Sequence, residues 1–111
     1  MGELSVGEDL TQQLTDSSRS LADRVGFAEG LADEESPAVV RALIRVAQNP
    51  DVPEALSSAV GASLGRICFR RAQDVDELVM ADFTGAAYIS YDKEIGRLQR
   101  LKPDVKMRRA V

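Results

Sequence analysis

The most constraining feature of this sequence is a pair of glycines, Gly61 and Gly65, in a segment that otherwise predicts a helix over about residues 52–71. Each glycine inside a helix costs roughly 1 kcal/mol relative to alanine. The predicted helix carries one stripe of large side chains and, about 100° around the axis, a second stripe of small ones. The large stripe is Leu56, Val60, Leu64 and Ile67, and the small stripe is Ser57, Gly61, Gly65, Cys68 and Ala72.

Two such stripes indicate a helix packed between neighbours. One neighbour meshes with the large side chains, and the other approaches the backbone closely over the glycines, where close contact offsets their cost. The alternative is an exposed, less stable helix whose glycines have no packing role.

The segment before this helix predicts an antiparallel partner. Ser36 suits an N-cap and Pro37 the first helical turn, so a helix is expected from Pro37. The Asn49-Pro50 pair ends it, because a residue before proline is disfavoured in the α region. Asp51 is then expected to cap the next helix, and the short connection predicts an αα-hairpin.

Two further helices are predicted. The first begins near Ser20 and carries the stripe Leu21, Val25, Ala28 and Leu31. The last begins at Asp82 or Thr84, follows the apolar stripe Tyr88, Tyr91, Ile95, Leu98 and Leu101, and ends before Pro103. Between them, Asp74 is a candidate cap for a short apolar segment at Leu78, Val79 and Met80.

The chain of 111 residues is rich in alanine, leucine and valine and only 5% aromatic, which favours packed helices over a β-sandwich. We therefore predict an all-α fold of four to five helices, with a single helical domain over 19–102. Residues 1–18 are expected to be a flexible acidic leader, although Leu10 and Leu14 also fit a frayed helix. Residues 103–111 are expected to be a basic flexible tail.

The sequence lacks residues that several classes of protein function require. The chain has no histidine, so the commonest general base and transition-metal ligand is missing. Its single cysteine, Cys68, fits a buried hydrophobe, and no intrachain disulfide is possible. The cluster at Asp74, Asp76 and Glu77 lacks the glycine and the further oxygen ligands of a calcium loop. We expect no enzyme activity, no cofactor and no metal.

No apolar run is long enough for a membrane span, and the start MGELSV does not resemble a secretory signal, so a cytoplasmic protein is expected. Charge is segregated along the chain, whose net charge is −4. Residues 1–35 carry nine acids and two bases, whereas residues 93–111 carry two acids and seven bases. The acidic N-terminal part and the basic C-terminal part could pair with each other, or each could bind a different partner.

The candidate binding residues are acids and tyrosines near the last helix. They are Asp74, Asp76, Glu77, Asp82, Tyr88, Tyr91 and Asp92. Tyrosine is enriched among interface hot spots, but both tyrosines also fit the core stripe, and each reading stays open. The basic tail could contact nucleic acid, but an acidic chain without aromatic residues among the basic ones argues against that as its main role.

Residues 37–67 resemble a HEAT-like repeat, through Asn49-Pro50-Asp51-Val52 at the turn and Ser63-Leu64-Gly65-Arg66-Ile67 at the end of the second helix. Pro53 and the extra turn Glu54-Ala55-Leu56 depart from that pattern. The resemblance implies a small right-handed stack of antiparallel helical hairpins, too short for a long solenoid.

The stretch from Leu43 to Leu98 is also similar to small acidic helical immunity proteins encoded beside bacterial polymorphic toxins of the contact-dependent-inhibition type. That resemblance implies a non-enzymatic inhibitor, a monomer or weak dimer, that binds a cognate toxin domain and occludes its active site. The alternative is a small HEAT-like scaffold or regulatory subunit without a toxin partner.

Overall fold

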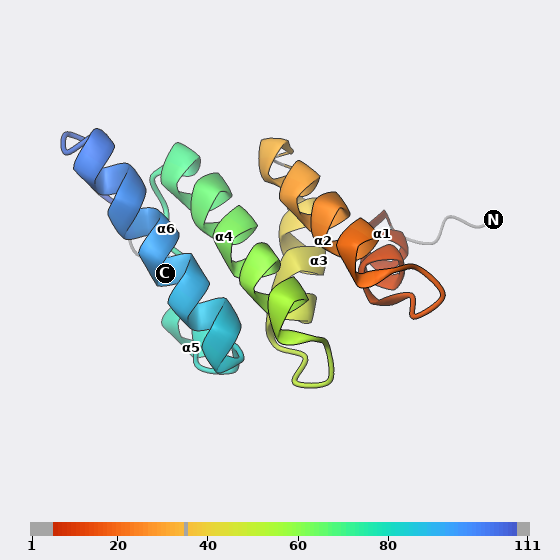
Figure 1. The fold of residues 1–111 in the computed structure, drawn as a ribbon. Coiled ribbons are helices and arrows are strands. Elements are labelled where there is room, and N and C mark those ends of the chain that lie inside the picture. Colours follow the sequence, from red (N-terminus) through yellow and green to blue (C-terminus); the bar gives the residue numbers. More distant parts are fainter. Residues whose placement is uncertain (1–5, 35, 109–111) are drawn as a thin grey trace.

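The chain folds into an all-α structure, as predicted (Figure 1). The computed structural model describes residues 6–34 and 36–108, with side chains from residue 10 onward. Its helices are α1 (Val6–Thr15), α2 (Leu21–Gly30), the 3₁₀ helix η1 (Leu31–Asp33), α3 (Pro37–Ala47), α4 (Glu54–Arg71), α5 (Glu77–Met80) and α6 (Gly85–Leu101). Among the described residues the only β-type pairing is an isolated bridge between Gln73 and Arg108.

The helices lie in two layers. Helices α2, α4 and α6 run side by side in the same direction, and α1, α3 and α5 lie behind them (Figure 1). Successive contacts along α4 establish the direction that it shares with α6: Gly61 and then Gly65 meet Ala87 and then Tyr91 of α6. Each front helix is therefore reached from its predecessor through a helix or turn of the back layer.

Helix α4 lies at the centre, in contact with α2, α3 and α6. Gly61 and Gly65 are both buried under α6. A Cβ atom added at Gly61 would overlap the carbonyl oxygen of Ala87, and one at Gly65 would lie 3.1 Å from the carbonyl oxygen of Tyr91. The predicted close approach over the glycines is confirmed. Large side chains fill the other faces: Leu56, Val60, Leu64 and Ile67 are fully buried.

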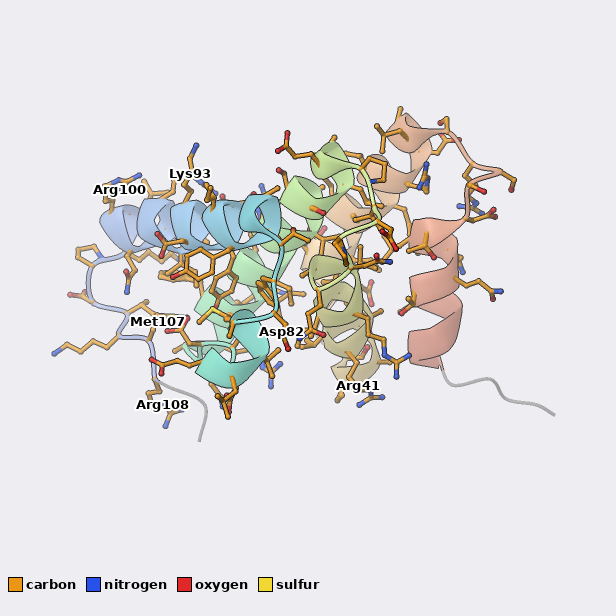
Figure 2. All side chains as sticks on the ribbon, turned by 90° about the horizontal axis from the view of Figure 1, so that it is seen from below. Arg41, Asp82, Lys93, Arg100, Met107 and Arg108 are labelled. Atoms are coloured by element: carbon orange, nitrogen blue, oxygen red, sulfur yellow. The ribbon has the colours of Figure 1, made fainter. Side chains whose placement is uncertain are left out.

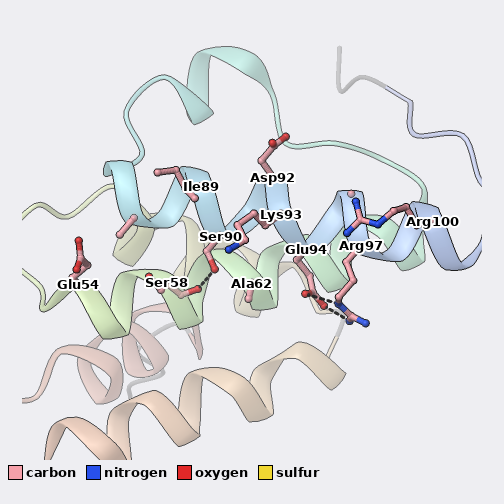
Figure 3. A pocket seen from close by; sticks show the side chains of 12 residues that line it. Glu54, Ser58, Ala62, Ile89, Ser90, Asp92, Lys93, Glu94, Arg97 and Arg100 are labelled. Atoms are coloured by element: carbon pink, nitrogen blue, oxygen red, sulfur yellow. Dashed lines mark hydrogen bonds and ion pairs between the residues drawn. The ribbon is translucent and has the colours of Figure 1, made fainter.

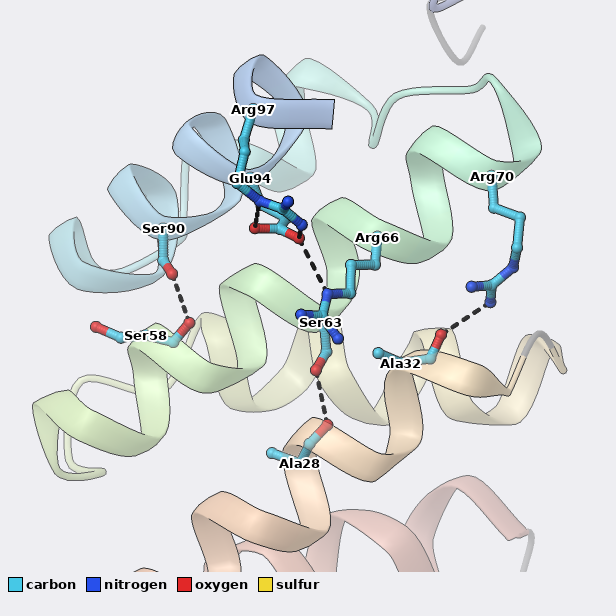
Figure 4. Close-up of polar contacts among 9 residues, drawn as sticks. All are labelled: Ala28, Ala32, Ser58, Ser63, Arg66, Arg70, Ser90, Glu94 and Arg97. Carbon is cyan, nitrogen blue, oxygen red and sulfur yellow. Dashed lines mark hydrogen bonds and ion pairs between the residues drawn. The ribbon is translucent and has the colours of Figure 1, made fainter. Parts of the chain in front are cut away.

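Polar contacts join the three front helices at fixed points (Figure 4). The Ser63 hydroxyl of α4 donates to the carbonyl of Ala28 at 2.7 Å, and Arg70 donates to the carbonyl of Ala32 at 2.9 Å. On the other side, the Ser90 hydroxyl of α6 donates to the carbonyl of Ser58 at 2.6 Å. Because these donors bond to helix carbonyls, they hold the helices close without burying an unpaired polar group.

Three helices begin where the sequence predicted a helix start, and the predicted N-cap at Ser36 is confirmed. Ser20, Ser36 and Thr84 cap α2, α3 and α6 through their side-chain oxygens. The prediction that Asp51 caps the next helix is wrong. Pro53 occupies the N-cap of α4 without a side-chain bond, because its backbone is fixed in an extended conformation just before the helix. Asp76, rather than Asp74, caps α5.

Two boundary predictions need correction. The described residues form six α-helices, more than the four to five expected, because α1 and the single-turn α5 both form. Helix α1 lies within the expected flexible leader, and its Leu14 is fully buried in the core. Apolar burial against α3 thus stabilises a segment that composition alone described as polar. Residues 1–5 of that leader lie outside the described residues.

The C-terminal segment is also ordered as far as Arg108, where a flexible tail was expected. The backbone N–H of Arg108 donates to the carbonyl of Ala72 at 2.9 Å, and the N–H of Asp74 donates to the carbonyl of Arg108 at 2.8 Å. Met107 packs against the core between these contacts. Residues 109–111 of the expected tail lie outside the described residues. No helix in the described part of the chain is long and apolar enough to cross a bilayer.

Candidate protein-binding surface

The segment between α4 and α6 forms a short projecting turn around α5. The chain leaves α4 through Ala72, whose backbone is left-handed with a φ of 53°, and this reverses its direction. Val79 and Met80 of α5 pack against the core. The side-chain amide of Gln48 donates to the carbonyl of Val79 at 3.1 Å. The turn is therefore anchored to the end of α3.

The outer side of this turn carries an unusual combination of charge and apolar exposure. Leu78 is 82% exposed, the highest value among the large exposed hydrophobic side chains. Asp76 and Glu77 precede it and Asp82 follows it. We call Asp76, Glu77, Leu78 and Asp82 the acidic α5 surface. From Ala72 to Asp92 the sequence holds five acids and no lysine or arginine, so this stretch of chain carries only negative side chains.

The structure separates Asp74 and Tyr91 from the other predicted binding residues. Tyr91 is only 3% exposed, and its hydroxyl donates to the Asp74 carboxylate at 2.6 Å while accepting the N–H of Val75 at 3.1 Å. Burial, with the nearby Cys68 thiol and Asp74 carboxylate, raises the pKa of Tyr91 above its ordinary value of 10.0. These contacts fix the start of the projecting turn, so the pair has a structural role.

Tyr88 and Asp92 lie on the exposed side of α6. Tyr88 is 48% exposed and belongs to the first turn of that helix, which begins three residues after Asp82. It therefore lies at the same end of the molecule as α5, whose turn runs close to the start of α6 (Figure 2). Asp92 lies one turn further along and points outward (Figure 3). The two tyrosines of the predicted stripe thus divide, with Tyr91 in the core and Tyr88 at the surface.

Three leucines predicted on apolar stripes or segments are exposed: Leu78 at 82%, Leu101 at 67% and Leu21 at 37%. Ile89, which lies outside the predicted stripe of α6, is 59% exposed. Leu78 was interpreted as part of an apolar segment with Val79 and Met80. A four-residue helix can bury only one side, and its N-cap at Asp76 decides which side that is. The adjacent acids at 76 and 77 were the only sequence signal that Leu78 faces outward.

Three basic side chains border an apolar groove between the ends of α4 and α6. Arg66, Arg70 and Lys102 border a groove of about 440 Å³ whose apolar lining is Phe69, Ala72, Leu98, Leu101 and Val105. A second, shallower groove of about 750 Å³ follows the outer sides of α4 and α6 (Figure 3). Glu94 lies within it, bound by Arg66 and Arg97, and the Arg97 bond is the main reason that the pKa of Glu94 is lowered.

Two features of the described residues bear on catalysis and metal binding: the Cys68 thiol and the arrangement of the acidic side chains. Burial raises the pKa of the Cys68 thiol above 9.0, which disfavours the nucleophilic thiolate. No group of three or more cysteine, aspartate or glutamate side chains in the described part of the chain is arranged to hold a metal ion. The arrangement suits recognition: an exposed apolar side chain surrounded by negative charge on an anchored turn.

Comparisons with known proteins add no family assignment. No protein-family model matches the chain, and neither the curated proteins nor the solved structures give a significant match.

Proposed function

We propose that this chain is a non-enzymatic protein-binding module whose acidic α5 surface binds a basic surface of another protein. The observation that supports this proposal is the exposure of Leu78, whose side chain is 82% exposed. Asp76 and Glu77 precede it and Asp82 follows it, and no lysine or arginine occurs from Ala72 to Asp92. An exposed apolar anchor with a charged rim is the usual anatomy of a specific interface. Tyr88, half exposed at the same end, supplies a second anchor.

In its most specific form, the proposal is that the chain is a cytoplasmic immunity protein that binds a cognate bacterial toxin domain. The mechanism is occlusion: the acidic α5 surface covers a basic active site, as a toxin that binds a nucleic acid or phosphate substrate would have. Complementary charge speeds the encounter and selects the partner, and Leu78 and Tyr88 slow dissociation once docked. This form rests on the sequence resemblance together with the charge of the surface.

The test is neutralisation followed by kinetics. The toxin domain encoded beside this gene is expressed with the wild-type chain or with the variant Asp76→Asn/Glu77→Gln/Asp82→Asn, in which the amide oxygen at position 76 would still accept the capping hydrogen bond. The matched control neutralises the exposed acids Glu29, Asp33 and Glu34, which changes the net charge equally on another face. We expect wild type and control to restore growth and the variant to restore it poorly.

Stopped-flow association at low salt distinguishes the proposed immunity function from the proposed binding site, the acidic α5 surface. The variant should associate about tenfold more slowly than the control, and added salt should remove the difference. If the toxin domain does not bind at all, the immunity function is overturned. If it binds and the variant associates as fast as the control, the acidic α5 surface is the wrong site.

A second candidate is a small HEAT-like scaffold or regulatory subunit. The observation that favours it is the two-layer arrangement, in which a helix or turn of the back layer precedes each helix of the front layer (Figure 1). We propose on the same ground that the fold is a right-handed HEAT-like stack. Purification of the native complex, with its components identified by mass spectrometry, separates the candidates. An assembly without any toxin supports the scaffold, and a crystal structure tests the handedness.

A further inference from the structure

Among the described residues, no helix covers the outer face of α6, because α6 is the last helix of the front layer (Figure 1). Lys93 and Arg100 point from it away from the rest of the molecule (Figure 2). Ile89, 59% exposed, lies on the same face near the start of the helix. Asp92, Lys93, Ile89 and Arg100 are all exposed, with Gly96 at the centre of the face.

The close approach of α6 explains the glycines of α4, but no such contact among the described residues explains Gly96. A Cβ added at Gly96 would meet only the tip of the Arg100 side chain, at 3.7 Å, whereas one at Gly61 would overlap the backbone of α6. A helix-interior glycine costs roughly 1 kcal/mol relative to alanine, and here no contact within the described chain offsets that cost. Apart from the flexible Arg100 side chain, no described residue covers the α6 backbone at Gly96.

The charges around Gly96 are self-complementary. Asp92 lies four residues before it and Arg100 four residues after it, so all three lie on one i±4 ridge. Neither Asp92 nor Arg100 has an ion-pair partner among the described residues. Suppose that α6 of a second copy crosses this helix in the antiparallel direction, with the twofold axis passing through Gly96. Asp92 of each copy then faces Arg100 of the other copy, which gives two Asp92–Arg100 ion pairs.

We propose that two copies of this chain associate through α6, crossing antiparallel at Gly96 in a closed twofold dimer. The crossing aligns the i±4 ridges of both helices, the commonest packing class for helices in globular proteins, and a glycine at the crossing lets the ridges approach. Lys93 and Gln99, three residues to either side of Gly96, turn to the flanks, where their long side chains reach water.

This inference does not depend on the proposed function. It assigns Asp92 to self-association, whereas the acidic α5 surface would serve the other protein. An isologous contact closes on itself, so the expected species is a dimer and no larger assembly.

The first test is a charge swap measured by sedimentation equilibrium over roughly 1 µM to 1 mM protein. Asp92→Arg and Arg100→Asp should each raise the dimer dissociation constant about tenfold or more, because each creates two like-charge contacts. The double variant Asp92→Arg/Arg100→Asp should recover near wild-type affinity. Arg41→Asp, an equal charge change on exposed α3, should have little effect.

A monomeric wild type throughout this range overturns the proposal, as does an assembly larger than a dimer. Equal dissociation constants for all variants, or no recovery in the double variant, also overturn it.

The second test measures proximity. Gly96→Cys and the control Gly26→Cys are made in a Cys68→Ala background, so that each chain holds one thiol. Gly26 is matched because it is also a helical glycine, and an added Cβ there meets nothing within 4 Å, whereas one at Gly96 meets only the end of the Arg100 side chain. A disulfide needs Cα atoms about 4.4–6.8 Å apart, which two Gly96 positions on the twofold axis satisfy. Gly96→Cys should form a disulfide-linked dimer much faster than Gly26→Cys, and equal rates contradict the proposal.

Discussion

Gly61 and Gly65 show how one absent methyl group decides where a neighbouring helix can lie. The backbone of α6 occupies the space that side chains at these positions would need, most severely at Gly61 against the carbonyl of Ala87. Glycine is poor in a helix taken alone, so the tertiary contact determines the residue. The same residue type at Gly26 has open space around it.

This contrast gives a paired prediction. Gly61→Ala should lower the free energy of unfolding by about 1–3 kcal/mol, because α6 must shift to admit the methyl group. Gly26→Ala should raise it by up to roughly 1 kcal/mol, since the helix gains propensity without a clash. Urea unfolding followed by circular dichroism measures both, and a stabilised Gly61→Ala variant would show that α6 does not lie on α4 as described.

Tyr91 gives a prediction in alkaline solution. Its pKa in the folded protein lies above 10.0, chiefly because burial disfavours the phenolate. Unfolding therefore releases a proton above pH 10, and the free energy of unfolding should fall as the pH rises beyond that value. In a Tyr88→Phe variant, where Tyr91 is the only tyrosine, phenolate absorbance should appear together with loss of helix. Absorbance that rises while the helices persist would contradict this.

The hydroxyl of Tyr91 can also be removed directly. Tyr91→Phe leaves the buried N–H of Val75 without its acceptor, so the free energy of unfolding should fall by about 1–3 kcal/mol. Tyr88→Phe is the matched control, because Tyr88 is half exposed. Equal urea midpoints for the two variants would remove the structural role assigned to the Tyr91–Asp74 pair.

At the scale of elements, the seam between α4 and α6 is closed by one carboxylate with two arginines. Arg66 of α4 bonds Glu94 at 3.0 Å, and Arg97 bonds it at 2.7 Å (Figure 4). The pKa of Glu94 is lowered, chiefly by Arg97 and further by Arg66, although burial opposes the shift. Its contribution to stability is thus present above pH 4.5 and is lost as the pH falls through the lowered pKa.

Glu94→Gln should therefore lower the free energy of unfolding at neutral pH by about 1 kcal/mol and flatten its dependence on pH in the acid range. Glu34→Gln, at an exposed position outside the seam, serves as the control. The measurement is urea unfolding from about pH 7 to about pH 3. A Glu94→Gln variant that loses stability with acid as steeply as the control would exclude Glu94 as the linking group.

At the scale of the whole molecule, the C-terminal segment returns to the junction between α4 and α5. Its backbone pairs with Ala72 and Asp74, and Met107 covers part of the core. Asp74 in turn accepts the hydroxyl of Tyr91, so the last described residues support the turn that carries the acidic α5 surface.

Deletion of residues 103–111 should lower the free energy of unfolding by about 1–3 kcal/mol, since Met107 is lost from the core and two backbone bonds are broken. It should also speed hydrogen exchange at the N–H of Asp74. Lys106→Ser, which removes one charge and leaves the backbone in place, should do neither. A deletion variant as stable as wild type would show that residues 103–111 contribute nothing to stability, as expected of a flexible tail.

Local signals explain how much of this fold could be predicted. The cap at Ser36, the helix starts near Ser20 and Thr84, and the apolar stripes of α3 and α4 depend on residues within four positions of one another. The sequence alone therefore predicts them. The sequence left α1 open between a frayed helix and a flexible leader, because its stability comes from Leu14 in a core built by distant residues. The C-terminal segment was missed because backbone pairing leaves no side-chain signature.

The candidate site divides in the same way. Sequence identified the acids and both tyrosines, but it could not tell the buried Tyr91 from the exposed Tyr88, since both belong to one stripe of α6. The exposure of Leu78 could not be predicted, because its neighbours in the sequence, Val79 and Met80, are also apolar; only the packing of α5 shows that Leu78 faces outward.

By itself, the sequence determined that Gly61 and Gly65 share one face of α4 with other small residues, because the helical repeat brings them there whatever the rest of the chain does. Only the tertiary structure decided that the neighbour over this face is α6, running parallel, and that Gly96 on the far side of α6 remains open. The reason is physical: periodicity fixes which side chains share a face, whereas the choice of what covers that face depends on contacts between residues far apart in the chain.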